Sequence, residues 1–344
     1  MLEMLRYYNV HMTLIIAEIA QAHDGSEGML ESLVRSSLKA GADAIKLQLH
    51  YAEHESTYDE TFRIQLSNQY SKRFDYWKHV EIKDHLLLKI KKIVQEEYKK
   101  KLIISPFSEY AIQKAQKIGI DYWKIASGEI YSDELINEML STKIPIIAST
   151  GLTDNVRLDF ISNLFKSNQP NYSKHGILHC VSSYPTPPSK ANLARAIKFK
   201  SDYPELNIGI SDHSGTTHPG IFAISHNLNL IEVHVTFSRD MYGPDSNSSI
   251  TFKELAYLAQ YKKFIGLALG NGSNQPMDVS TKDLFTKSLC TKTPLPKGHV
   301  VKDSDLCLKK PGTGINPKMK KDYVGRKLAR NVSNLNILKP RDFL

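Results

Sequence analysis

Short apolar runs recur along the chain, and each is followed by a segment whose apolar residues have helical spacing. The runs are rich in Ile, Leu and Val, and most are apolar at both odd and even positions near their start. Such runs are typical of strands buried on both faces of a parallel sheet. The sequence therefore predicts eight strands, at 14–19, 43–49, 102–107, 122–127, 145–150, 176–180, 207–212 and 230–236.

The segments between these runs predict helices. Residues 30–38 place leucine and valine on one face, and Gly41 follows as a helix stop. Residues 111–118 form a second apolar stripe that ends at Gly119, and Ser132 is positioned to cap a helix with an acidic first turn. Eight strand–helix units over about 250 residues predict a (β/α)8 TIM barrel, an α/β fold. An open doubly wound sheet is less favoured because no glycine-rich dinucleotide loop follows the first strand.

Two segments depart from the strand–helix rhythm. The polar and aromatic segment at 50–79 is too long for an ordinary connection, and it predicts either a lid that contacts substrate or a short-helix excursion without a chemical role. A run rich in Gly, Asn and Pro at 270–278 predicts a linker, and short pieces punctuated by Pro and Gly follow it. The predicted domains are a barrel at 1–270, a linker at 271–285 and a small, mostly β domain at 286–344.

The charge is distributed unevenly, which excludes some classes of function. The 344 residues carry a net charge of +9, but 14 Lys and Arg against four Asp and no Glu lie between Thr286 and Leu344. The rest of the chain is nearly neutral, so a nucleic-acid-binding protein is not expected. Three scattered cysteines exclude a disulfide framework, and no signal sequence or membrane-length apolar segment is present. We expect a cytoplasmic protein with no membrane partner.

Polar residues gather at the C-terminal ends of the predicted strands, where barrel enzymes carry their catalytic groups. Period-2 spacing places Lys46 with Gln48, Ser211 with His213, and Glu232 with His234 on common faces. Ser127 and Glu129 share a face that Lys124 does not, so the fourth strand must bulge or end near Gly128. The other polar residues at strand ends are Glu18, Ser105, Ser149, Ser182 and Tyr184.

Two kinds of chemistry follow from these residue types. His213 and His234, at the ends of neighbouring strands, are candidate ligands for a divalent metal such as Mn, Fe, Co or Zn, although either histidine alone is more often structural. Lys46 and Lys124 lie in otherwise apolar strands, where an ammonium group needs a negative partner. That partner is either an internal glutamate or an anionic substrate held with the help of the serine hydroxyls.

The residues resemble the sialic acid synthase (N-acetylneuraminate synthase) family over nearly the whole chain from about Leu14. Eight blocks occur in the order typical of that family. They are AEIAQAHDG (17–25), GADAIKLQ (41–48), WKIASGEI (123–130), IASTGL (147–152), LHCVSSYPTP (178–187), ISDHSG (210–215), IEVHVTFSRDMYGPD (231–245) and KKPGTGI (309–315).

The resemblance implies a barrel followed by an antifreeze-like (SAF) domain, usually in a domain-swapped homodimer. It also implies condensation of phosphoenolpyruvate with an N-acetylated hexosamine such as N-acetylmannosamine, with C–O cleavage and phosphate release. A 6-deoxy diacetamido hexose, leading to legionaminate or pseudaminate, is the alternative acceptor.

The resemblance also assigns roles to individual residues. It assigns a divalent metal, Mn or Mg and possibly Co, to His213 and His234, with Glu232 near the metal. It gives Glu18 a supporting role near the lysines. It assigns phosphoenolpyruvate to Lys46, Ser105, Lys124, Ser127, Ser149, Ser182 and Ser211. It assigns the sugar and its activation to Gln48, Glu129, Tyr184 and Asp245, with Glu129 as the general base.

Some positions depart from the family pattern. Ala20 and Ala22 replace the usual Gly and Asn of the first block, and Ser182 stands where some members carry Asn. Lys310 stands where many members place an Arg over the acetamido group of the sugar, which keeps the charge but loses the planar fork. Two other classes remain open: a metal-dependent aldolase that uses pyruvate, and a non-enzymatic module that binds polyanions through the basic C-terminal segment.

Overall fold

The computed structural model describes residues 13–64, 69–167, 171–269 and 279–344. The chain divides into two compact units, Met1–Gly270 and Asn271–Leu344. Each unit is described by itself. The predicted linker run at 270–278 lies outside the described residues.

The first unit is a closed barrel of eight parallel strands. Each strand pairs with the next along the chain, and the first also pairs in parallel with the eighth, which closes the sheet. A short ninth strand, β9 (Ile250–Thr251), pairs in parallel with the last two residues of β8, Val235 and Thr236. The barrel strands are β1 (Leu14–Glu18), β2 (Ala44–Leu49), β3 (Lys101–Pro106), β4 (Tyr122–Ile125), β5 (Ile146–Ser149), β6 (Gly176–Cys180), β7 (Asn207–Asp212) and β8 (Leu230–Thr236).

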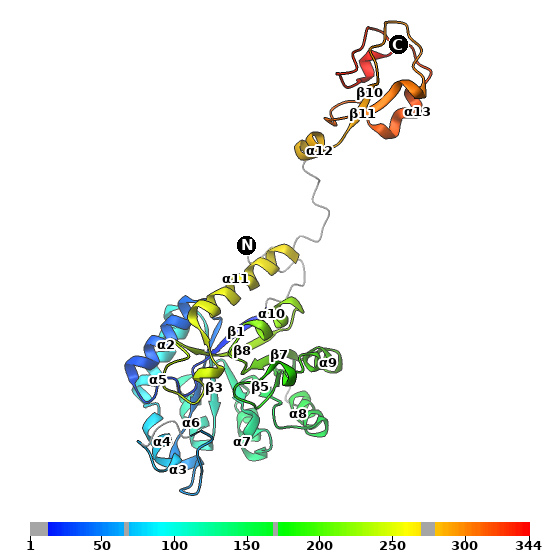
Figure 1. The fold of residues 1–344 in the computed structure, drawn as a ribbon. Coiled ribbons are helices and arrows are strands. Elements are labelled where there is room, and N and C mark those ends of the chain that lie inside the picture. Colours follow the sequence, from blue (N-terminus) through cyan, green and yellow to red (C-terminus); the bar gives the residue numbers. More distant parts are fainter. Residues whose placement is uncertain (1–12, 65–68, 168–170, 270–278) are drawn as a thin grey trace. The chain divides into compact units, whose positions relative to one another are not determined.

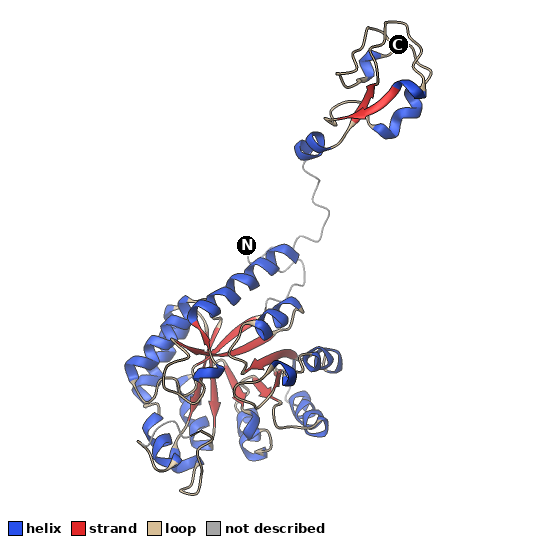
Figure 2. Cartoon of the chain, in the orientation of Figure 1, coloured by secondary structure: helices blue, strands red, loops and turns tan. Residues whose placement is uncertain are grey.

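Helices surround this barrel (Figures 1 and 2). After β2 the main helix, α5, continues into a π-helical turn, Lys92–Glu97. The surrounding helices are α2 (Glu27–Lys39), α5 (Asp84–Lys91), α6 (Glu109–Ile118), α7 (Asp133–Ser141), α8 (Asn155–Ser167), α9 (Ala194–Asp202), α10 (His218–Ser225) and α11 (Phe252–Leu269). The predicted (β/α)8 fold is confirmed.

Local sequence signals mark both ends of α6 but not the start of α7. Gly119, at φ 84°, ends α6, and the side chain of Ser108 accepts a hydrogen bond from Ala111 N at the start of that helix. Ser132 occupies the N-cap position of α7, but its hydroxyl makes no cap hydrogen bond. The prediction of a capping side chain there is wrong, because Ser132 Oγ instead donates to Glu129 Oε2 at 2.8 Å.

Alternate residues of each strand point to opposite sides of the barrel wall. Ile15, Ala17 and Ile19 belong to the large buried cluster between strands and helices, whereas Ile16 lies in a separate cluster. We interpret this second cluster as the floor of the barrel interior, since period-2 alternation places its members on the inner face. Its other buried members are Ala44, Ile103, Ile147, Leu178 and Leu230.

A polar layer lies two residues beyond this apolar floor on each strand. The same alternation that points Ile16 inward points Glu18 inward, and the step from Ala44 leads to Lys46. The corresponding residues of the other strands are Ser105, Lys124, Ser149, Cys180, Ser211 and Glu232. The candidate site therefore lies directly on the packed core at the C-terminal end of the barrel.

The segment at 50–79 folds into short helices. They are α3 (Ala52–Glu55) and α4 (Arg73–Val80), and they bury a small apolar cluster of their own. Its buried members are Ala52, Tyr76, Trp77 and Val80. The described part of this segment thus contains the short helices of one prediction, while contact with substrate stays a prediction.

The second unit is small and contains a two-stranded antiparallel sheet. β10 (Ser288–Thr291) pairs with β11 (Leu306–Lys309), and the short helices are α12 (Val279–Phe285) and α13 (Lys320–Tyr323). Its own buried apolar cluster includes Leu289, Val301, Ile315, Leu328 and Leu338. Across the ranges that the structure describes, no helix has both the length and the apolar character needed to cross a membrane.

Candidate active site

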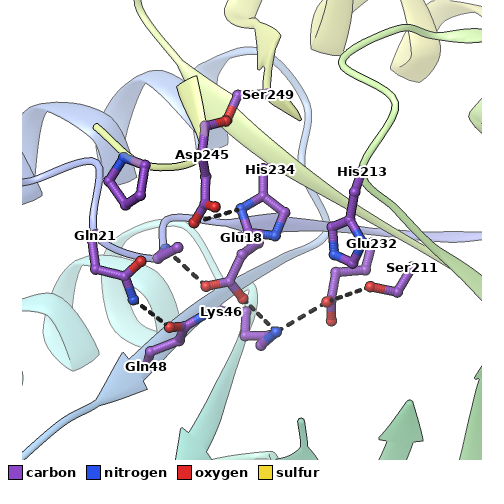
Figure 3. Close-up of polar contacts among 12 residues, drawn as sticks. Glu18, Gln21, Lys46, Gln48, Ser211, His213, Glu232, His234, Asp245 and Ser249 are labelled. Carbon is purple, nitrogen blue, oxygen red and sulfur yellow. Dashed lines mark hydrogen bonds and ion pairs between the residues drawn. The ribbon is translucent and has the colours of Figure 1, made fainter. Parts of the chain in front are cut away.

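Lys46 lies at the centre of the polar layer, between two buried carboxylates (Figure 3). Its Nζ is 2.6 Å from Glu18 Oε2 and 3.0 Å from Glu232 Oε1. Strand register produces this arrangement, since Glu18 of β1 is paired with Lys46 of β2 on one side and His234 of β8 on the other. All three side chains of the ion-pair cluster are at most 3% exposed.

Lys124 extends the same network from the opposite side of the barrel. Its Nζ donates to Ser149 Oγ at 2.6 Å and lies 3.5 Å from Glu232 Oε1. Ser211 Oγ also donates to Glu232 Oε1, at 2.9 Å. Ser105 Oγ donates to the main-chain carbonyl of Lys124 at 3.1 Å, so this hydroxyl links β3 to the neighbouring β4.

Burial and charge act differently on the two lysines. Burial lowers the pKa of Lys124 to about 8, with the positive charge of Lys46 acting in the same direction. Burial also disfavours the charged form of Lys46, but the carboxylates of Glu18 and Glu232 outweigh it and raise the pKa above its usual value. The lysines in turn hold the pKa of Glu232 well below its usual range, although burial alone would raise it. Two ammonium groups and two carboxylates thus balance in a volume shielded from water.

The two candidate metal-ligating histidines lie close together beside this network. Their ring centroids are 5.1 Å apart. His213 Nδ1 is 3.0 Å from the carbonyl oxygen of Val181, which only accepts, so we assign the proton to Nδ1 and a free lone pair to Nε2. Burial, followed by the nearby His234, lowers the pKa of His213 to about 3, so the ring is neutral.

His234 carries an unpartnered buried nitrogen. Its side chain is buried, and within the described residues its Nδ1 has no hydrogen-bond partner. The Oδ2 of Asp245 is the near carboxylate oxygen, at 3.8 Å. No group of three or more His, Cys, Asp or Glu with metal-site geometry occurs among the described residues.

The residues assigned to the sugar line the other side of the histidines. The Tyr184 ring lies 4.0 Å from that of His213, and Gln48 Oε1 accepts a hydrogen bond from Gln21 Nε2 at 2.6 Å. Asp245 is bound by Arg63, whose Nη2 is 2.6 Å from Oδ1. The Arg63 guanidinium also lies 4.4 Å above the Tyr184 ring.

Gly151 is surrounded by small polar side chains at the end of β5. Its N–H donates to Ser127 Oγ at 3.2 Å. A Cβ at this position would lie 2.3 Å from Ser182 Oγ and 2.7 Å from Ser127 Oγ, so any larger residue would have to displace both hydroxyls. Ser127, Ser182 and the Gly151 N–H therefore lie close together. Hydroxyl and N–H donors gathered in this way suit the binding of a phosphate or carboxylate group.

Two predicted site residues are not joined to this constellation. β4 ends at Ile125, and Ser127–Glu129 forms a 3-10 turn, so the predicted strand to Ser127 is two residues too long. In the part of the chain that is described, the Glu129 carboxylate is bonded to Ser132 and not to Lys46 or Lys124. Lys310 belongs to the second unit, where its ammonium lies 5.4 Å from the Phe285 ring centroid.

Three residues of the site escaped sequence reasoning. Cys180 is buried, with its Sγ 3.5 Å from Ser127 Oγ and 3.9 Å from His213 Nδ1. Cys180 lies two residues after the inward-facing Leu178 on β6, so period-2 spacing could have predicted that its side chain points into the barrel. Gln21 and Arg63 lie in loops, where no periodicity indicates direction.

Comparison with known sequences gives the family. The sequence model of the NeuB family matches residues 33–274. The chain belongs to the NeuB family. An N,N'-diacetyllegionaminic acid synthase of Legionella pneumophila is 29% identical, over 93% of this chain and 91% of its own length. A pseudaminic acid synthase of Campylobacter jejuni is 26% identical, over 96% of each chain.

A solved structure agrees with this family. The sialic acid synthetase of Leptospira borgpetersenii superposes with a TM-score of 0.65 and 27% identity, covering 78% of this chain and 89% of its own. The resemblance to sialic acid synthases is confirmed, and so is the expectation of an enzyme of the N-acetylneuraminate synthase kind.

Proposed function

We propose that this NeuB-family protein condenses phosphoenolpyruvate with an N-acylated amino sugar to form a sialic acid-type nonulosonate and release phosphate. The observation that carries the proposal is the buried Lys46–Lys124 network, which lies beside the closely spaced rings of His213 and His234 at the C-terminal end of the barrel. A substrate that brings both phosphate and carboxylate requires such cations. The serines of this layer, Ser105, Ser127, Ser149, Ser182 and Ser211, supply hydroxyl donors.

We propose a divalent metal at His213 and His234, and two features of these side chains support the proposal. His213 presents a neutral ring with Nε2 free, and His234 has a buried nitrogen without a partner, as metal-binding imidazoles require. The two ammonium groups of Lys46 and Lys124 already balance the carboxylates of Glu18 and Glu232, so an added cation offsets part of the charge that an anionic substrate brings. His213 and His234 would hold the ion, Mn or Mg and possibly Co, with Glu232 nearby. Such an ion supplies Lewis-acid polarisation of the acceptor aldehyde.

The chain's own residues account for the remaining steps. Lys46 and Lys124 hold phosphoenolpyruvate so that its methylene carbon forms a bond to the aldehyde carbon, whose oxygen takes up a proton. The electron pair of the enol double bond makes that bond and leaves the phosphate-bearing carbon cationic. Water adds there and loses a proton, after which the C–O bond to phosphate breaks and the keto group forms.

Glu129 is the carboxylate proposed to take the proton from that water. Among the carboxylates predicted for the site, Glu18 and Glu232 are paired with lysines and Asp245 with Arg63. Glu129 accepts a hydrogen bond from the neutral hydroxyl of Ser132, so this contact places no cation against its carboxylate. Tyr184, Gln48 and Asp245 would hold the sugar.

Assembly and location are proposed as well. We assign the second unit as an SAF domain, and we expect a domain-swapped homodimer in which Lys310 of one copy reaches the acceptor bound to the other. The domain limits stay as proposed, with a linker at 271–285. The protein is expected to act in the cytoplasm without a nucleic-acid or membrane partner.

The reaction is tested with a panel of acceptors. The protein is incubated with phosphoenolpyruvate, Mn and either N-acetylmannosamine or a 6-deoxy diacetamido hexose, and phosphate and product mass are measured. We expect stoichiometric phosphate and a product equal in mass to the acceptor plus pyruvate. Turnover with pyruvate in place of phosphoenolpyruvate would instead identify a metal-dependent aldolase.

Gly151 provides a test of the serine cradle. Gly151→Ala should raise the KM for phosphoenolpyruvate by roughly 30-fold, because the added methyl displaces two hydroxyls that each contribute about 1 kcal/mol. The matched control is Gly128→Ala, since a Cβ at Gly128 meets no atom within 4 Å. Steady-state kinetics of both variants decide the matter, and an equal KM in the two would argue against the cradle.

A further inference from the structure

A cavity beside the candidate active site is lined largely by aromatic rings. Phe62, Tyr76 and Trp77 come from the segment at 50–80, and Tyr242 comes from the loop after β8. Gln21 and Arg63 also line it. Nothing in the proposed chemistry uses this cavity.

The cavity adjoins the residues assigned to the acceptor sugar. Gln21, which lines it, donates a hydrogen bond to Gln48 at 2.6 Å, and the two side chains face each other in Figure 3. Arg63, also part of the lining, binds Asp245 at 2.6 Å and covers the Tyr184 ring at 4.4 Å. Each of the three proposed sugar residues in this region thus touches a wall of the cavity.

Tyr76 supplies an independent indication of a ligand. Its side chain is 7% exposed, and within the described residues its hydroxyl has no hydrogen-bond partner. Burial, then the nearby Asp24 carboxylate, raises the pKa of Tyr76, so the hydroxyl stays protonated and is a donor. A buried hydroxyl without a partner is unfavourable, and most buried polar groups have a hydrogen-bond partner in the protein, in water or in a ligand.

We propose that this cavity binds an acylamino group of the acceptor, at the end of the sugar away from its aldehyde. The carbonyl oxygen accepts from Tyr76, and the methyl group packs against the aromatic walls. The proposal rests on the proposed function and narrows its substrate. N-acetylmannosamine carries its one acetamido group on the carbon next to the aldehyde, and its distal end has hydroxyls but no methyl group to pack against the rings. A 6-deoxy diacetamido hexose carries a second acetamido group that fits.

The first test compares two isosteric variants. Tyr76→Phe removes only the proposed donor, whereas Tyr51→Phe removes another buried hydroxyl without a partner from the same segment, outside the cavity. The ratio of kcat/KM for the diacetamido hexose to kcat/KM for N-acetylmannosamine should fall roughly 5- to 10-fold in Tyr76→Phe. It should not change in Tyr51→Phe. Neither variant should lower the Tm, because each removes an unsatisfied hydroxyl.

The second test does not depend on turnover. Trp77 lines the cavity, and the other tryptophan, Trp123, is fully buried behind the barrel wall. Titration of the diacetamido hexose alone should change the intrinsic fluorescence of the wild-type protein, and Trp77→Phe should abolish that change.

The outcomes separate the two proposals. A fluorescence response to the sugar without phosphate release from any acceptor overturns the proposed reaction and supports the cavity assignment. Phosphate release with an unchanged kcat/KM ratio in Tyr76→Phe overturns the cavity assignment and leaves the reaction intact. Absence of the fluorescence response also overturns the cavity assignment.

Discussion

Lys46→Met is expected to lower the free energy of unfolding by about 3–5 kcal/mol, since it leaves the buried Glu18 carboxylate without a cation and Glu232 with only the more distant Lys124. Glu18 and Glu232 are at most 2% exposed and both lie within 3.0 Å of the Lys46 ammonium. The same change should reduce kcat/KM for phosphoenolpyruvate roughly 100- to 1,000-fold, as expected for loss of a buried charge-assisted contact. Chemical denaturation and steady-state phosphate release measure the two effects.

A second variant separates stability from catalysis. In the double variant Glu18→Gln with Lys46→Met, Glu232 still faces Lys124, so each remaining buried charge keeps an opposite partner. We expect it to regain about 2 kcal/mol or more relative to Lys46→Met while remaining inactive. Lys101→Met is the surface control, because its exposed ion pair with Asp121 contributes at most about 1 kcal/mol. A stable and active Lys46→Met protein would contradict the assignment.

Strand periodicity explains why much of this site is predictable from sequence. Each strand repeats every two residues, so an apolar residue facing the barrel interior places the residue two positions later on the same side. Ile16 thus indicates Glu18, and Ile147 indicates Ser149. The closed parallel register then places residues of neighbouring strands side by side, as it does Glu18 with Lys46 and with His234.

The two-residue alternation of side chains does not apply beyond the ends of the strands. β4 ends before Ser127, and its continuation as a 3-10 turn changes the direction of Glu129, which no alternation rule anticipates. Ser132 has the residue type and position of a helix cap, yet its hydroxyl donates to Glu129 and accepts no cap hydrogen bond, because its backbone (φ −84°, ψ 78°) departs from the extended geometry of an N-cap. Arg63 reaches Asp245 from a segment far away in sequence, so their contact depends on loop conformation alone.

His234→Ala is expected to reduce turnover by about 1,000-fold or more, because loss of a metal ligand removes several kcal/mol of charge stabilisation at the aldehyde oxygen. Binding offers a readout besides activity. Mn should raise the Tm of the wild-type protein in a concentration-dependent way, and this rise should be lost in the variant. The expectation rests on the buried His234 nitrogen without a partner and on the neutral ring of His213 at 5.1 Å.

The control replaces a histidine that has no part in the site. His226 ends α10, where its ring hydrogen-bonds the carbonyl of Phe222 near the surface, so His226→Ala should retain both turnover and the response to Mn. Chelation followed by readdition of Mn should restore wild-type turnover but not that of His234→Ala. If His234→Ala turns over normally, or if its Tm still rises with Mn as in the wild type, the two histidines are structural and the electrostatic balance around Lys46 must be met without a metal.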